Sequence, residues 1–119
     1  MATINYAAET LQPANSQTYV AWTPMANGDS GQEHPSWPGA DRSIQVLGTF
    51  GTGGTVLIEG SNDKTSPTNW ATLRDPAGNN LSITSAGIKQ VLEFTRWIRP
   101  RVSAGDGTTS ITVQMLVAR

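Results

Sequence analysis

Short segments in which apolar and polar residues alternate recur along this chain at intervals of roughly ten residues, and they limit the fold more than any other feature. The clearest is TSITVQMLVA, where Ile111, Val113, Met115 and Val117 occupy every second position. A period of two places one face of a segment on a core and the other in water, which is the pattern of a β-strand. Further strands of this kind are predicted within residues 17–23, 43–50, 55–60, 70–74, 81–84 and 96–103.

Turn-forming residues separate these segments. GTGG at 51–54 joins two alternating segments, and we expect those two to form a hairpin. AGDG at 104–107 and DPAGNN at 75–80 predict further tight turns. Residues 85–95 fit a helical spacing as well as a period of two, and we favour a strand because both neighbours are strands. The 119 residues are therefore expected to form one all-β domain, an antiparallel β-sandwich or jelly roll of about eight short strands.

Two segments lie outside this pattern. Residues 1–16 show little periodicity and are expected to form an N-terminal arm, which leaves 17–119 as the sandwich domain. Residues 24–41 form a long loop with three prolines and three glycines. Loops of this length in a small domain are often functional, so the arm and the loop are the expected contact segments.

The composition argues against most kinds of catalytic and metal-binding site. The chain has no cysteine, which excludes disulfides, thiolate metal sites and a cysteine nucleophile. Its single histidine, His34, lies in the long polar loop without a G-x-S-x-G motif, and we interpret it as an exposed loop residue. Asn62, Asp63 and Asp106 lie in oxygen-rich loops, but no EF-hand pattern is present, so a calcium site is not favoured. We expect no enzyme activity, no cofactor and no metal.

The charge and hydropathy exclude two further classes. A net charge of −1 argues against a strongly electrostatic nucleic-acid binder, which usually carries a basic surplus. No segment approaches the roughly 20 apolar residues of a membrane helix, and the N-terminus lacks the features of a signal peptide. We expect neither nucleic acid nor a membrane as a partner.

Arg96, Trp97, Arg99 and Arg101 form the one basic cluster of the sequence. Trp97, Arg99 and Arg101 share a face if the strand is regular. Basic and aromatic side chains together can bind single-stranded nucleic acid, stack on one another, or pair with acidic residues of a partner protein. With a net charge of −1, the packing and partner-protein interpretations are favoured.

The run GSNDKTSPTNW raises the question of a ligand loop. We interpret SNDKTSPTN, 61–69, as a structural connection with Ser, Asn, Asp and Pro in turn-forming positions. Trp70 is expected to close one end of the core.

Two stretches carry a resemblance to a known family. They are VLIEGSNDKTSPTNWATLRDPAGNNLSIT at 56–84 and RWIRPRVSAGDGTTSITVQML at 96–116. The order G-S-N-D, N-W-x-x-L, R-aromatic-I-R-P-x-V and a final Thr-rich strand resembles small structural proteins of tailed bacteriophages. It is most similar to capsid decoration, or cement, proteins with a jelly-roll fold, over roughly residues 43–119. The resemblance implies a virion protein, made in the host bacterial cytoplasm, that binds the capsid exterior and joins neighbouring capsomers. Its partner would be the major capsid protein, and it would work as a homodimer or homotrimer.

The same motif order is also similar to discoidin-type jelly rolls, which bind carbohydrate or lipid. The alternative is therefore a discoidin-like carbohydrate-binding module, for example on a phage tail or fibre protein. Residue type and location nominate the protein-interface candidates of a decoration protein. These are the aromatic residues Tyr6, Trp22 and Trp37, together with Arg99 and Arg101 as charge partners.

Overall fold

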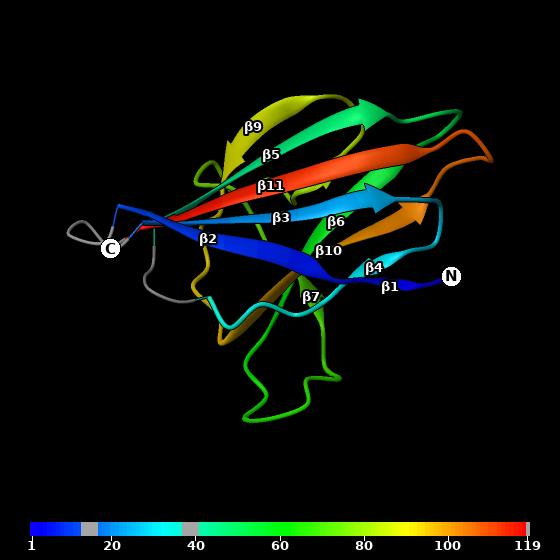
Figure 1. Cartoon of the computed structure of the whole chain (residues 1–119). Coiled ribbons are helices and arrows are strands. Elements are labelled where there is room, and N and C mark those ends of the chain that lie inside the picture. Colours follow the sequence, from blue (N-terminus) through cyan, green and yellow to red (C-terminus); the bar gives the residue numbers. More distant parts are fainter. Residues whose placement is uncertain (13–16, 37–40, 119) are drawn as a thin grey trace.

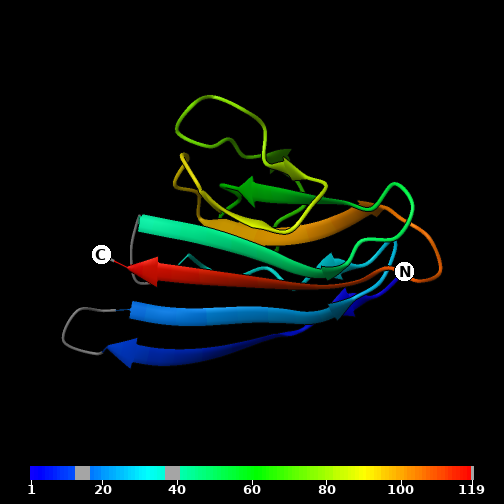
Figure 2. The ribbon, with the colours of Figure 1, turned by 90° about the horizontal axis from the view of Figure 1, so that it is seen from above.

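The computed structural model describes residues 1–12, 17–36 and 41–118, which form two β-sheets packed face to face (Figure 1, Figure 2). No helix occurs in these residues, so the predicted all-β class and sandwich are confirmed, and no helix is present that could cross a bilayer. Sheet A contains β1 (Thr3–Ile4), β4 (Ser30–Gly31), β10 (Trp97–Ala104), β6 (Thr55–Ser61), β7 (Ala71–Thr72) and β8 (Ser82–Ile83). Sheet B contains, in order, β2 (Tyr6–Gln12), β3 (Gln17–Met25), β11 (Ser110–Ala118), β5 (Asp41–Thr49) and β9 (Gly87–Gln90).

The strand pairs are antiparallel apart from the short parallel pair of β1 and β4. The expectation was about eight strands, and eleven are present in the described residues. The three additional strands are β1, β2 and β4, because the predicted segments 70–74 and 81–84 already contain β7 and β8. β1 and β4 have two residues each. Two residues are too few to show an alternation in a sequence.

The GTGG turn does not make a hairpin, contrary to the prediction. β5 pairs with β11 and β9 in sheet B, whereas β6 pairs with β10 in sheet A, so the turn crosses between the layers. Two consecutive strands show the same alternation whether they pair in one sheet or lie in opposite sheets, because in both arrangements their apolar side chains point into the core. The turn between β10 and β11 crosses between the sheets in the same way.

A set of hydrogen bonds ties these two crossing turns together. The Asp106 carboxylate accepts the N–H of Thr52 at 2.8 Å, and the Thr109 hydroxyl donates to the Phe50 carbonyl at 2.8 Å. The hydroxyl of Thr108, followed by backbone donors, holds the pKa of Asp106 well below its usual range. One carboxylate therefore fixes both connections at this end of the sandwich.

The described part of the expected N-terminal arm belongs to the sandwich. β1 pairs with β4 in sheet A, and β2 pairs with β3 along one edge of sheet B. β2 cannot be predicted from the sequence, because residues 7–11 are exposed on both faces of the strand and so show no alternation of apolar and polar residues. The boundary predicted at residue 17 therefore falls between two paired strands.

Much of the 24–41 segment also follows the sheets. β3 continues to the buried Met25, and β4 pairs with β10. At Gly31 a Cβ atom would lie 2.6 Å from Pro100 and 2.8 Å from Trp22, so glycine is required between those rings. The loop is thus held against the edge of sheet A.

His34 is buried, which corrects its interpretation as an exposed loop residue. The backbone of His34 forms a β-bridge with Ile98, and its Nδ1 accepts the N–H of Ser36 at 3.1 Å. The His34 ring packs edge-on against the Tyr6 ring, with 5.0 Å between the ring centres. Burial lowers the pKa of His34 to about 4, because desolvation disfavours the charged ring. The sequence gives no sign of these partners, since they come from three separate segments.

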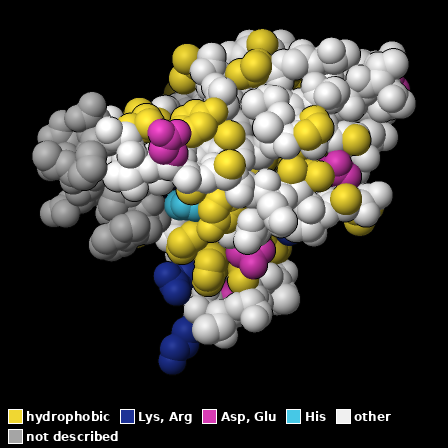
Figure 3. Space-filling model, viewed as in Figure 1, with side chains coloured by type: hydrophobic (Ala, Val, Ile, Leu, Met, Phe, Trp, Pro, Cys, Tyr) yellow, Lys and Arg dark blue, Asp and Glu magenta, His cyan; other side chains and the backbone are white. Residues whose placement is uncertain are grey.

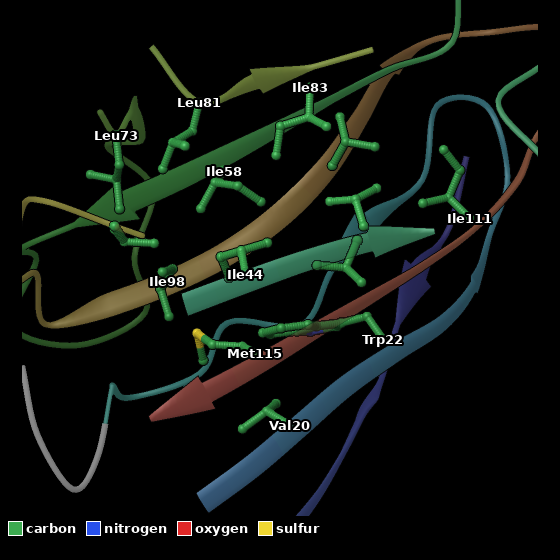
Figure 4. Close-up of a cluster of buried hydrophobic side chains, with 14 of the residues drawn as sticks. Val20, Trp22, Ile44, Ile58, Leu73, Leu81, Ile83, Ile98, Ile111 and Met115 are labelled. Atoms are coloured by element: carbon green, nitrogen blue, oxygen red, sulfur yellow. The ribbon is translucent and has the colours of Figure 1, made fainter. Parts of the chain in front are cut away.

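The core lies between the sheets and is apolar. Figure 4 shows Trp22, Ile44, Ile58 and Met115 converging from β3, β5, β6 and β11. Trp22 is completely buried, and its indole N–H donates to the Gln32 carbonyl at 2.9 Å. Trp22 is therefore a core residue, and its prediction as a contact anchor is wrong.

Candidate functional site

The outer face of sheet A carries the basic cluster found in the sequence. Burial alternates along β10, so that Ile98 and Val102 face the core. The intervening Trp97, Arg99 and Arg101 are half-buried on the outer face, which confirms that they share it. We call this region, together with Glu59 and Trp70, the arginine–tryptophan face.

Glu59 organises this face. The register of β6 and β10 places Glu59 directly opposite Arg99. Its two carboxylate oxygens accept the Nε–H groups of Arg99, at 3.0 Å, and Arg101, at 3.1 Å. The Glu59 side chain is 7% exposed, while those of Arg99 and Arg101 are 21% and 36% exposed. One covered carboxylate therefore serves two guanidinium groups, and the trio carries one positive charge in excess.

Two aromatic rings support the arginines. The Arg99 guanidinium lies 4.1 Å from the centre of the Trp70 ring, and that of Arg96 lies 4.7 Å from the centre of the Trp97 ring. These distances are those of cation–π contacts. Trp70 is half-buried beneath Arg99 and is not a member of the core cluster, so it does not close the core as expected.

The loop of residues 61–70 positions these rings. The Asp63 carboxylate accepts the backbone N–H groups of Thr68 at 2.8 Å and Asn69 at 2.9 Å. These bonds, with that from Asn69 the largest, lower the pKa of Asp63 to about 2. The Asp63 carbonyl accepts the indole N–H of Trp97 at 2.9 Å. The loop is thus fixed to itself and to β10, as its structural interpretation requires. In Figure 3 the Lys and Arg side chains of this view gather mainly at the lower end, beside this loop.

A hollow of about 410 Å³ lies beside the same loop. Its lining includes the polar residues Asn62, Asn69 and Glu93 and the aromatic ring of Phe94. Phe94 is 56% exposed and lies near the Arg42 guanidinium, 5.2 Å from its ring centre. An exposed aromatic ring beside polar side chains is a common arrangement for holding a small polar ligand.

The predicted interface residues that the structure describes form two separate pairs, Arg99 with Arg101 on the arginine–tryptophan face and Tyr6 with Trp22 at the core. Tyr6 is half-buried at the start of β2, where its ring packs edge-on against Trp22 and His34. Trp37 lies outside the described residues.

Sequence reasoning missed Glu59 and the role of Trp70. The lone acidic residue in VLIEG was the available signal. Its partner Arg99 is 40 residues away, and the pairing of β6 with β10 cannot be read from either segment.

The acidic loops do not assemble a metal site in the described part of the chain. No group of three or more histidine and acidic side chains lies close enough there to hold an ion. The carboxylates of Asp63 and Asp106 instead accept hydrogen bonds within and between turns. That the protein uses no cofactor stays a prediction.

Comparison with protein-family models, with curated proteins and with solved structures finds no match to this chain.

Proposed function

We propose that this protein is a non-catalytic binding module, a capsid decoration protein that docks its arginine–tryptophan face on acidic side chains of the major capsid protein. It would lie on the exterior of the virion and join neighbouring capsomers, as the family resemblance implies. The observation that carries the proposal is the single carboxylate of Glu59 shared between Arg99 and Arg101.

The geometry suits recognition of carboxylates. Arg99 and Arg101 use their Nε–H groups on Glu59. Each guanidinium has five N–H donors, and within the described residues no hydrogen bond uses the terminal ones of Arg99 and Arg101, so these can bind a partner. A carboxylate can accept two parallel bonds from such a fork, and charge-assisted bonds of this kind are the strong ones.

The face is also held in place before binding. Glu59 and Trp70 fix the Arg99 side chain from two directions. A side chain that is already ordered loses less conformational entropy when it binds. A modest affinity per contact is enough, because repeated sites on a capsid multiply it through avidity.

Co-sedimentation with capsids of the phage that encodes the protein tests this proposal. Arg99→Ala and Arg101→Ala should each reduce the bound fraction, most clearly at low salt. Arg74→Ala is the matched control, because Arg74 is an exposed arginine that pairs with Glu93 rather than Glu59. Equal binding by all three variants, or absence of the protein from purified virions, would contradict the proposal.

The hollow beside Phe94 favours a second candidate, a carbohydrate-binding module. An exposed ring next to Asn62 and Asn69 can stack on a sugar while the amides bind its hydroxyls. Trp70 directly follows Asn69 and reports on this site by fluorescence. A glycan array with no hits, combined with no fluorescence change on sugar titration, would exclude this candidate; Phe94→Ala should abolish any response that is seen.

A further inference from the structure

The outer edge of β2 is an open strand edge. β2 ends sheet B and pairs with β3 on one side, and no other strand of the described residues pairs with it (Figure 2). Residues 7–11 are all exposed. An open edge presents backbone donors and acceptors to any strand that can lie alongside.

The backbone groups that point outward can be identified. The N–H of Tyr6 donates to the Gln32 side chain at 3.3 Å, so it points away from β3. In an antiparallel pair, residues alternate between bonding their partner strand and pointing away from it. The register of β2 and β3 is regular from Tyr6 to Thr10. The N–H and C=O groups of Ala8 and Thr10 therefore also point outward.

The opposite edge of the same sheet is protected. In β9, the residue Lys89 lies directly opposite the buried Ile44, so the two side chains are on the inner face of the sheet. An inward-pointing charge on an edge strand disfavours the approach of another strand. The outermost strands of sheet A, β1, β7 and β8, have two residues each and offer little to pair with. β2 has seven residues and a single charge, Glu9.

We propose that β2 pairs antiparallel with β2 of a second copy of this chain, joining the two five-stranded sheets about a two-fold axis. Each outward residue offers a donor and an acceptor, so an identical strand running in the opposite direction satisfies both. A two-fold contact uses the same edge on both copies and removes it from both. Because Lys89 protects the other edge, the assembly stops at two copies.

The charge on β2 selects the register. A pairing centred on Glu9 would place two carboxylates directly opposite each other, which is destabilising. A pairing centred on Ala8 places each Glu9 opposite the small Ala7 of the other copy. The two Ala8 residues then exchange both of their bonds, and the N–H of Thr10 donates to the Tyr6 carbonyl of the other copy. The Thr10 carbonyl of the other copy then replaces the Gln32 side chain as the acceptor of the Tyr6 N–H.

Cross-linking tests the register directly, because the chain has no cysteine of its own. In this pairing the two Ala8 Cα atoms lie about 5.5 Å apart, within the range that a disulfide spans. Under mild oxidation Ala8→Cys should form a disulfide-linked dimer. Gln90→Cys, at an exposed position of the protected β9 edge, is the control and should not form such a dimer. Equal cross-linking of the two variants would overturn the proposal.

Solution mass tests the assembly, with no capsid present, so its result is independent of the proposed capsid docking. The wild type should sediment with twice the chain mass of 12.6 kDa. Ala8→Pro removes an outward N–H without removing a bond to β3, and should give a folded monomer. If that variant does not fold, Ala8→Lys keeps the donor and sets like charges opposite each other, with the same expected monomer. A wild type that is monomeric at every concentration, or a dimer that survives these substitutions, would overturn the proposal.

Discussion

Replacing Glu59 with glutamine separates the charge of this carboxylate from its shape. In the native protein its two oxygens accept hydrogen bonds from Arg99, at 3.0 Å, and Arg101, at 3.1 Å. Glutamine keeps the volume but has one acceptor oxygen, and its amide group donates. Glu59→Gln can therefore serve one guanidinium, while its NH₂ group faces the donor of the other.

The magnitude follows from the exposure of the partners. A hydrogen bond that involves a charged group contributes about 1.5–3 kcal/mol to stability. The Arg101 side chain is 36% exposed, so water replaces part of the lost bond. We expect a loss of about 2 kcal/mol in the free energy of unfolding, which in a domain of this size lowers the Tm by about 8 °C.

Thermal unfolding and urea titration of matched variants measure this loss. Glu93→Gln is the control, because Glu93 forms a 2.6 Å ion pair with Arg74, whose side chain is 52% exposed. Exposed pairs contribute only about 0–1 kcal/mol. If Glu59→Gln unfolds at the same temperature as Glu93→Gln, Glu59 does not organise the arginine–tryptophan face, and the reasoning is refuted.

Three other predictions concern stability. Gly31→Ala should lower the Tm sharply, because the new methyl group would lie 2.6 Å from Pro100 in a packed layer; a change in Tm of less than a degree or two, as for a surface substitution, would contradict this. The pKa of His34 is about 4 in the folded protein against an ordinary 6.5, so between these pH values the unfolded state binds a proton that the folded state does not. The free energy of unfolding should therefore be at its full value above pH 6.5 and fall by about 3 kcal/mol as the pH drops towards 4. Urea titrations at pH 7 and 5 should show about 2 kcal/mol of this loss, and a His34→Gln variant should lose that part of the pH dependence. Asp106→Ala should speed hydrogen exchange at the Thr52 amide, measured by NMR, while core amides exchange at an unchanged rate.

The sequence predicts the class of this fold because alternation is a local property. The faces of β10 and β11 are correct to the residue, since each strand has one buried and one outer face. The strand with which each strand pairs does not follow from alternation. The GTGG turn is equally compatible with a hairpin and with a crossing between sheets. In the structure it crosses, because β5 lies in sheet B and β6 in sheet A.

The candidate site was predictable only in part for the same reason. Arg99 and Arg101 are two residues apart on one strand, so their common face follows from the strand period alone. Glu59 lies beside these arginines because β6 pairs with β10, and these two strands are far apart in the sequence. β2 was missed because an edge strand exposed on both faces has no apolar period to detect.

The crossing turns described above have a consequence for the rate at which the chain folds. Because β5 and β6 lie in different sheets, as do β10 and β11, the longest ladders cannot form from neighbouring hairpins. β11 pairs with β3 and β5, and β10 with β6, so distant parts of the chain must meet before these ladders form. Chains dominated by such distant pairings fold in milliseconds to seconds, roughly, rather than microseconds. Refolding from denaturant should therefore be slow, and a freshly made chain spends that time with unpaired strand edges exposed.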